Sequence, residues 1–283
     1  MKILVTGAHG LTGQQFRLSA ASAGHETVEL RSDLTRPTDL RTEISQLRID
    51  AVVHLAAISY VAHDDDRAFY DVNLFGTLNL LEALAALPYP LKKVLLASSA
   101  NVYGNCEASP IAETQVPAPV NHYAMSKLAL EHMALARYSQ LPLVITRPFN
   151  YTGPGQAEQF VIPKLVSHFR RAAPTVTLGN LHVQREYNDV RFVCEAYLRL
   201  LETGRGRSLY NVCTGVTYDF NTVIGMLQEL TGHTISVQVD PALVRANEVH
   251  RLCGDPTRLR EAIGELPAYG LKDTLAWMLE NAA

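Results

Sequence analysis

The stretch K-I-L-V-T-G-A-H-G-L-T-G, from Lys2 to Gly13, decides how this chain folds. An apolar run leads into the three glycines Gly7, Gly10 and Gly13, and the residues after them read as a helix. A turn between a buried strand and a helix gathers backbone amides at the positive end of the helix dipole, where proteins bind pyrophosphate. Glycine permits the tight turn and the close approach of a ligand. The stretch therefore indicates a nucleotide-binding turn, although the glycines alone leave a purely structural turn open.

The first half of the chain alternates apolar strands with helix-like segments. The expected strands are Lys2–Thr6, Thr27–Arg31, Ala51–Leu55, Lys93–Ser98 and Leu143–Arg147. The expected helices are Leu11–Ala23, Pro37–Leu47, Asp66–Leu87 and Asn121–Gln140. Continuous apolar strands separated by helices predict an α/β fold, a doubly wound parallel sheet of the Rossmann type. After Pro148 the segments become shorter and richer in turn formers, which predicts a smaller C-terminal α/β lobe.

Composition narrows the classes of partner and compartment. The chain has 283 residues, 47% of them hydrophobic, and a formal net charge of −3. This balance gives no reason to expect nucleic acid or a membrane as partner, and no apolar stretch is long enough to span a bilayer. The cysteines lie far apart with no C-x-x-C pair, so we predict reduced thiols in a cytoplasmic protein. The histidine spacing predicts no metal site.

A second motif, Y-A-M-S-K, places Tyr123 and Lys127 four residues apart and so on one face of a helix. A phenol ionises near pH ~10, and a nearby ammonium group lowers that value towards the range useful for acid–base chemistry. Ser99 lies in L-L-A-S-S-A-N-V-Y-G at the carboxyl end of a predicted strand, where a doubly wound sheet forms its active crevice. Its hydroxyl can hydrogen-bond a substrate carbonyl. Ser98 would point the other way.

The order and separation of these motifs resemble the extended short-chain dehydrogenase/reductases, the NAD-dependent epimerase/dehydratase family. The resemblance covers essentially the whole chain and implies that Ser99, Tyr123 and Lys127 are catalytic, with the last two also contacting the cofactor. The other cofactor-binding residues that it implies are Gly7, Gly10, Leu11, Thr12, Gly13, Arg31, Asp33, Leu34, Leu55, Ala56 and Ala57.

The residue at the end of the second strand distinguishes NAD from NADP, because an acidic side chain binds ribose hydroxyls and an arginine accommodates a 2′-phosphate. Arg31 stands at about that point, so we predict NADP(H), with NAD(H) as the alternative. In the family, Asp33 and Leu34 would contact the adenine, and 55–57 would lie along the cofactor. We assign residues 1–150 and about 183–213 to the NADP-binding domain, and 151–182 and 214–283 to a nucleotide-sugar-binding lobe.

Three later segments resemble those by which GDP-sugar members of the family hold their substrate. They are R-P-F-N-Y-T-G-P-G-Q (147–156), L-G-N-L-H-V-Q-R-E-Y-N-D-V-R (178–191) and V-R-A-N-E-V-H-R-L-C-G-D-P-T-R-L-R-E (244–261). The resemblance implies that the substrate contacts are Ser99, Asn150, Arg185, Arg245 and Glu248. Guanidinium groups match phosphate geometry, and a carboxylate accepts two ribose hydroxyl protons. Ala246 and Phe192 depart from the family pattern.

Dehydratases of this family carry a threonine followed by two acidic residues, whereas this chain has Ser99, Ala100 and Asn101. The resemblance therefore implies NADPH-dependent reduction of the 4-keto group of GDP-4-keto-6-deoxy-D-mannose. The product would be GDP-D-rhamnose or its 4-epimer, GDP-6-deoxy-D-talose. A nucleotide-sugar 4-epimerase with tightly bound NAD and a non-catalytic NADP-binding regulator remain alternatives. Family members commonly form homodimers through the helices that correspond to Asp66–Leu87 and Asn121–Gln140.

Overall fold

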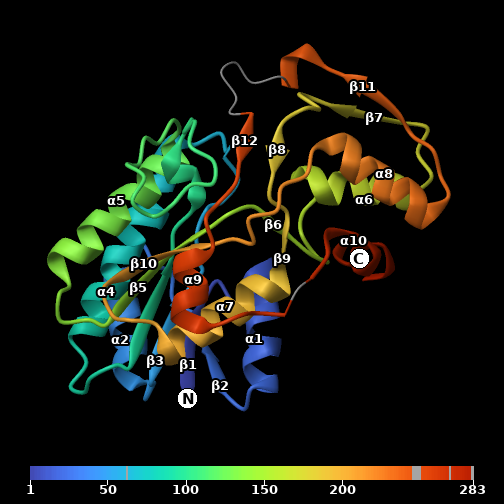
Figure 1. Ribbon diagram of the computed structural model, residues 1–283. Helices are drawn as coiled ribbons and strands as arrows, with labels where there is room; N and C mark the ends of the chain where they lie inside the picture. The colour runs from blue at the N-terminus through green and yellow to red at the C-terminus, as the bar shows by residue number, and fades with distance from the viewer. Residues whose placement is uncertain (62, 244–249, 268, 282–283) are drawn as a thin grey trace.

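The computed structural model describes residues 1–281 except residues 62, 244–249 and 268 (Figure 1). Within these residues the largest sheet has six strands in the order β10-β5-β4-β3-β1-β2. They are β1 (Lys2–Thr6), β2 (Glu26–Glu29), β3 (Ala51–His54), β4 (Lys93–Ala97), β5 (Leu143–Pro148) and β10 (Ser208–Val212). Every neighbouring pair is parallel. The predicted doubly wound parallel sheet is confirmed.

Helices cover both faces of this sheet (Figure 1). They are α1 (Leu11–Ser22), α2 (Pro37–Gln46), the π-helix η1 (Phe69–Gly76), α4 (Thr77–Ala85), α5 (His122–Arg137), α7 (Val190–Thr203) and α9 (Thr257–Ile263). Two shorter helices, α3 (Asp66–Ala68) and η2 (Ala100–Tyr103), precede η1 and follow β4. The predicted helix over 66–87 is one stretch formed by α3, η1 and α4. Its middle is wound as a π-helix, which no periodicity in the sequence predicts.

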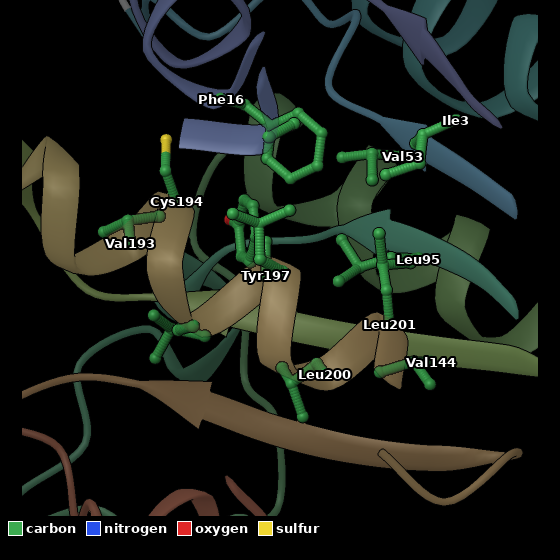
Figure 2. Close-up of a cluster of buried hydrophobic side chains, with 14 of the residues drawn as sticks. Ile3, Phe16, Val53, Leu95, Val144, Val193, Cys194, Tyr197, Leu200 and Leu201 are labelled. Atoms are coloured by element: carbon green, nitrogen blue, oxygen red, sulfur yellow. The ribbon is translucent and has the colours of Figure 1, made fainter. Parts of the chain in front are cut away.

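Successive side chains of each strand point to opposite faces of the sheet, so each strand contributes to two separate cores. Ile3 and Val5 of β1 face α1 and α7, whereas Leu4 between them faces α2, α4 and α5. Figure 2 shows the first core, in which Tyr197 and Leu201 of α7 lie beneath the sheet. Burial on both faces explains why the strands read as continuous apolar runs rather than as alternating ones.

The strand order reverses between β1 and β3, which is the place where sheets of this type bind ligands. The chain runs from β1 to β2 on one side and then returns to β3 on the other side of β1. Where the strand order reverses in this way, the loops after the two strands diverge and leave a crevice at their carboxyl ends. The glycine turn follows β1, and the segment 55–57 follows β3, so both lie at this point.

A second group of elements forms a lobe beside the sheet (Figure 1). It comprises α6 (Val161–Arg170), β7 (Thr175–Leu178), α8 (Phe220–Thr231), β11 (Ser236–Val239), the 3-10 helix η3 (Pro241–Leu243) and α10 (Leu271–Asn281). Helices α6, α8 and α10 share an apolar core with the pair β7–β11. Helix α9, from a segment that we assigned to the lobe, instead packs its Leu259 and Ile263 into the core of the large sheet.

Two short parallel pairs lie along the lobe side of the sheet. They are β6 (Tyr151–Thr152) with β9 (Asn188–Asp189), and β8 (Gln184–Arg185) with β12 (Arg251–Leu252). The division of the chain into two domains stays a prediction. None of the helices in the described part of the chain has the length and apolarity needed to cross a membrane.

Candidate active site

Glycine stands at each of the three positions after β1 for a different structural reason. A Cβ atom on Gly13 would lie 2.1 Å from the carbonyl oxygen of Gly7, and one on Gly7, whose φ is +68°, would lie 2.7 Å from the backbone nitrogen of Ala56. A Cβ atom on Gly10 would meet its nearest atom at 3.5 Å, an ordinary contact. Gly7 and Gly13 therefore close the packing of the turn, while Gly10 leaves the N-terminus of α1 open. This cradle fits a pyrophosphate.

A groove beside the turn contains both an acidic and a basic residue. Its lining consists of Gly7, Ala8, His9, Gly10, Glu29, Leu30 and Arg31. The prediction that the second strand ends at Arg31 is wrong, because β2 ends at Glu29. The backbone amide of Arg31 turns away from β1 and donates to the carboxylate of Glu43 at 2.9 Å. Glu29 forms an ion pair with His9, so an acidic residue occupies the strand end and Arg31 follows it in the groove.

The side chains of Asp33 and Leu34 are both engaged within the protein. The carboxylate of Asp33 accepts hydrogen bonds from the backbone amide and the hydroxyl of Thr35, each at 2.8 Å, which lower the pKa of Asp33. Leu34 is buried in the core with α2 and α4. The structure thus places these two residues near the groove, with their side chains directed to local contacts.

The segment after β3 is fixed to β1 by one hydroxyl group. The backbone amides of Leu55 and Ala56 each donate to the hydroxyl oxygen of Thr6 at 3.1 Å. Leu55, Ala56 and Ala57 are half-buried at the strand end, beside the glycine turn. Their backbone is therefore held in place at the switch point before any ligand binds.

His54 completes this arrangement and was not predicted as a site residue. Its ring is buried, with Nδ1 2.7 Å from the hydroxyl of Thr6 and Nε2 2.8 Å from the hydroxyl of Thr77. Thr77 donates its own proton to the carbonyl of Asn73 at 2.6 Å, so it accepts from Nε2–H, and Nδ1 accepts from Thr6. Burial, with a smaller effect of Lys127, lowers the pKa of His54 to about 3. The ring is neutral at physiological pH.

Ser99 and Tyr123 meet at the carboxyl end of β4. Tyr123 lies in the first turn of α5, where the Asn121 side chain caps the helix by accepting from the amide of Ala124 at 2.9 Å. Ser99 follows β4 and accepts from the amide of Asn101 at 3.2 Å. The side chain of Ser99 acts on the phenol of Tyr123, and both residues are largely buried. The structure thus brings together two residues that the sequence motifs place far apart.

The pKa values around Tyr123 are set by burial more than by charge. Burial raises the pKa of Tyr123 to about 12, although Ser99 lowers it. The expected lowering by Lys127 is not among the causes. The ammonium group of Lys127 donates to the carbonyl of Ala97 at 2.8 Å, and burial lowers the pKa of Lys127 to about 8. Tyr123 is therefore a neutral phenol at neutral pH, the form that a proton donor needs.

Ser98 faces away from Ser99, as predicted. Its hydroxyl donates to the carboxylate of Glu131 on α5 at 2.5 Å. Arg147 of β5 pairs with the same carboxylate, with Nε 3.0 Å from Oε1 and Nη2 2.6 Å from Oε2. This buried ion pair was not predicted as part of the site.

Tyr151 also enters the site and was missed as a functional residue. Its phenolic oxygen lies 2.8 Å from the hydroxyl of Thr12 in the first turn of α1. Its electrostatic effect raises the pKa of Tyr123. The signal was available in the sequence, because Tyr151 directly follows Asn150 in the segment singled out as a substrate contact.

Two of the predicted substrate residues lie at the short strand pairs. Asn150 is exposed, and its carbonyl accepts from the amide of Asn188 at 2.9 Å. Arg185 is half-buried on β8, with Nη1 2.9 Å from the carbonyl of Gln184. Arg245 and Glu248 lie outside the described residues.

A buried carboxylate supports this side of the site. Glu186 accepts from the backbone amides of Gly254 at 2.6 Å, Thr214 at 2.9 Å and Gly215 at 3.3 Å. The side-chain amide of Asn188 adds a fourth hydrogen bond at 3.1 Å. Glu186 thereby joins the chain next to Arg185 to the segment that follows β12.

The sequence profile of the family described as GDP-mannose 4,6 dehydratase matches residues 12–278. The chain belongs to this family. Among its relatives, GDP-6-deoxy-D-talose 4-dehydrogenase of Aggregatibacter actinomycetemcomitans is 34% identical over 274 residues, covering 93% of this chain and 92% of the relative. GDP-6-deoxy-D-mannose reductase of Pseudomonas aeruginosa is 35% identical over 295 residues, covering 99% and 96%. A solved structure, RMD from Pseudomonas aeruginosa complexed with NADPH, is 34% identical with a TM-score of 0.91, covering 99% of this chain and 98% of that one.

Proposed function

We propose that this protein uses NADPH to reduce the 4-keto group of GDP-4-keto-6-deoxy-D-mannose, forming GDP-D-rhamnose or its 4-epimer, GDP-6-deoxy-D-talose. The observation that carries the proposal is that Ser99, at the carboxyl end of β4, acts on the phenol of Tyr123, with Lys127 one helical turn further along α5. The names of the two relatives, one a GDP-sugar reductase and one a GDP-sugar 4-dehydrogenase, support the same chemistry.

The residues of this chain would handle the proton and orient the ketone. A bound nicotinamide cofactor supplies the hydride. Tyr123, protonated because burial raises its pKa to about 12, would donate its proton to the oxygen at C4 as negative charge develops there. Ser99 would hydrogen-bond the same oxygen, and Lys127 would stabilise the phenolate that remains. The roles of Ser99 and Tyr123 are those proposed from the sequence, whereas Lys127 was expected to lower the pKa of Tyr123 and to bind the ribose.

Reduction is favoured over dehydration because the site lacks acidic groups next to Ser99. A dehydration requires a general acid and a general base at the sugar. Ala100 and Asn101 follow Ser99, and Ala100 is buried in the core behind β4. A carbonyl reduction needs only the groups that are present.

The cofactor would bind along the switch point, with Gly10, Leu11 and Thr12 at its pyrophosphate and residues 55–57 along its length. Arg31 in the adenosine-side groove supports NADPH, as does the NADPH complex of the relative. Glu29 at the end of β2 supports NADH, because a carboxylate suits ribose hydroxyls. We therefore propose NADPH as the preferred cofactor and NADH as a slower one.

The nucleotide sugar would lie between the sheet and the lobe, contacted by Asn150 and Arg185. In the sequence, the predicted contacts Arg245 and Glu248 shortly precede β12, the strand that pairs with β8 and its Arg185. Glu186 supports this proposal because its carboxylate joins the chain next to Arg185 to the backbone amide of Gly254.

We also propose a cytoplasmic homodimer. The helical stretch η1–α4 and helix α5 pack against each other, and Phe75 and Met125 on them are 54% and 46% exposed. A second copy would cover these apolar side chains. The four buried, unpaired cysteines support a reducing compartment. Light scattering of the wild type and of Phe75→Glu tests the dimer, which the substitution should dissociate.

The function is tested by mixing the purified protein with GDP-4-keto-6-deoxy-D-mannose and NADPH or NADH. We expect reduced-nicotinamide absorbance to fall, faster with NADPH, and NMR of the product to distinguish rhamnose from talose. Tyr123→Phe should bind NADPH but turn over about 10² to 10⁴ times more slowly. Wild-type protein that oxidises neither cofactor would exclude this substrate.

One observation favours a second candidate, a nucleotide-sugar 4-epimerase. Glu29 at the strand end is the type of residue that holds NAD, and an epimerase would retain NAD through purification. Denaturing the protein and assaying released NAD tests this alternative. A non-catalytic NADP-binding regulator would instead keep its biological activity in Ser99→Ala and Tyr123→Phe.

A further inference from the structure

Behind the proposed catalytic residues lies a buried carboxylate to which the reaction itself assigns no role. The side chain of Glu131 is 4% exposed, and that of its partner Arg147 is 5% exposed. Taking both charges out of water is costly, and a chain that needed only stability could fill this space with apolar side chains. The cost of burying both charges indicates that this ion pair has a role besides stability.

Glu131 joins the three elements that carry the site. It lies on α5, one turn after Lys127, so the two side chains share a helix face. Its Oε1 accepts from Ser98 at the end of β4 and from Arg147 at the end of β5. Ser98 directly precedes Ser99, so the position of one serine limits that of the other. The contact holds the end of β4 against α5, about two turns after the first turn that carries Tyr123.

The negative charge of Glu131 also acts on Lys127. Burial lowers the pKa of Lys127, and Glu131 is the group whose charge raises it, so the pKa remains at about 8. The other titratable groups around Glu131 and Lys127 are Arg147 and His54. Arg147 lies over the ring of Tyr103, with 4.8 Å between Cζ and the ring centroid, and His54 is neutral. Neither supplies the negative charge that a buried ammonium group needs.

We propose that Glu131 is a positioning residue for the reaction: through Ser98 it fixes Ser99, and its carboxylate keeps Lys127 in the ammonium form beside Tyr123. The inference rests on the proposed function where it concerns turnover. The state of Lys127, however, can be measured without any substrate.

In activity assays a single substitution would confuse this role with folding, since Glu131→Gln leaves Arg147 buried without its charge partner. The double variant Glu131→Met with Arg147→Met removes both charges and keeps apolar volume. It therefore tests the loss of the Glu131 charge without leaving Arg147 unpaired. Ser98→Ala is the matched control, because it breaks the contact to β4 and leaves the charge of Glu131 in place.

The first measurement is the titration of Lys127 by NMR of ¹³C-lysine-labelled protein, with Lys127→Arg used to assign the signal. We expect the pKa of Lys127 in the double variant to fall by about one unit or more below the wild-type value, and in Ser98→Ala to stay unchanged. The same pKa in the double variant and the wild type would overturn the proposal. If the double variant does not fold, Glu131→Gln gives the same comparison by removing the charge alone.

The second measurement is the pH dependence of kcat. In the double variant the loss of activity at high pH should begin at a lower pH than in the wild type, because Lys127 loses its proton earlier. Ser98→Ala should lower kcat without moving this limb or changing the KM for NADPH. A kcat in Ser98→Ala equal to the wild-type value would contradict the role given to Ser98. Wild-type protein without turnover would reject the proposed function, while the titration of Lys127 would still decide this inference.

Discussion

The hydroxyl of Thr12 lies 2.8 Å from the phenolic oxygen of Tyr151, which connects the glycine turn to the first strand after Pro148. Thr12 stands in the first turn of α1. The hydrogen bond therefore links the proposed pyrophosphate site to Tyr151, whose electrostatic effect raises the pKa of the proposed catalytic tyrosine.

Tyr151→Phe should weaken NADPH binding by about 2- to 10-fold, the effect of one hydrogen bond of about 0.5–1.5 kcal/mol. Thr12→Val should have a similar effect, and the double variant should bind no more weakly than either single variant, because they break the same interaction. Titration of NADPH fluorescence measures all three. Fully additive losses would show that the two hydroxyls act separately.

The glycines offer a matched pair of substitutions. Gly13→Ala should prevent folding or strongly lower the melting temperature, because its Cβ would lie 2.1 Å from the carbonyl oxygen of Gly7. Gly10→Ala has room for its methyl group, so its melting temperature should stay within a few degrees of the wild type while NADPH binding weakens. Thermal unfolding and NADPH titration test the pair. Tight NADPH binding by Gly10→Ala would place the pyrophosphate elsewhere.

Cofactor choice should depend on Glu29 and Arg31 in opposite directions. Arg31→Ala should reduce kcat/KM for NADPH about tenfold or more relative to NADH, since a charge-assisted hydrogen bond contributes about 1.5–3 kcal/mol. Glu29→Gln should increase the preference for NADPH, because it removes a negative charge from the groove. The ratio of kcat/KM for the two cofactors is the measurement. An unchanged ratio in both variants would move the 2′-phosphate site out of this groove.

His54 should make the fold sensitive to mild acid. Its pKa is about 3 in the folded protein and about 6.5 in an unfolded chain, so between these values the unfolded state binds the extra proton. The contribution of His54 to stability is therefore complete above pH ~6.5 and is lost as the pH falls towards 3. In His54→Gln, the free energy of unfolding should decline less steeply between pH 6.5 and 4 in urea titrations. Equal slopes would mean that His54 does not titrate on unfolding.

Most of the sheet could be predicted because its signals are local. The apolar runs and glycine turn mark β1, β3, β4 and β5 to within a residue or two, since strands buried on both faces leave little else to read. Arg31 shows the limit: T-V-E-L-R reads as strand throughout, but the carboxylate of Glu43, which is distant in sequence, draws the backbone away after Glu29.

The candidate site could be predicted where a single sequence motif contains its residues at a telling spacing or position. Tyr123 and Lys127 were found by their spacing, and Ser99 by its place at a strand end. Thr6, His54, Glu131 and Tyr151 act through partners on other elements, so their roles depend on the folded chain. The pKa of Tyr123 likewise depends on burial, which a four-residue spacing does not reveal.

The most direct test of the central claim is deuterium transfer from NADPH labelled at the transferable position of its nicotinamide. The account predicts one deuterium at C4 of a single GDP-6-deoxy sugar, seen by NMR after incubation with GDP-4-keto-6-deoxy-D-mannose, and almost none with Tyr123→Phe. Oxidation of the cofactor without deuterium at C4, or conversion of the sugar without oxidation of the cofactor, would contradict it.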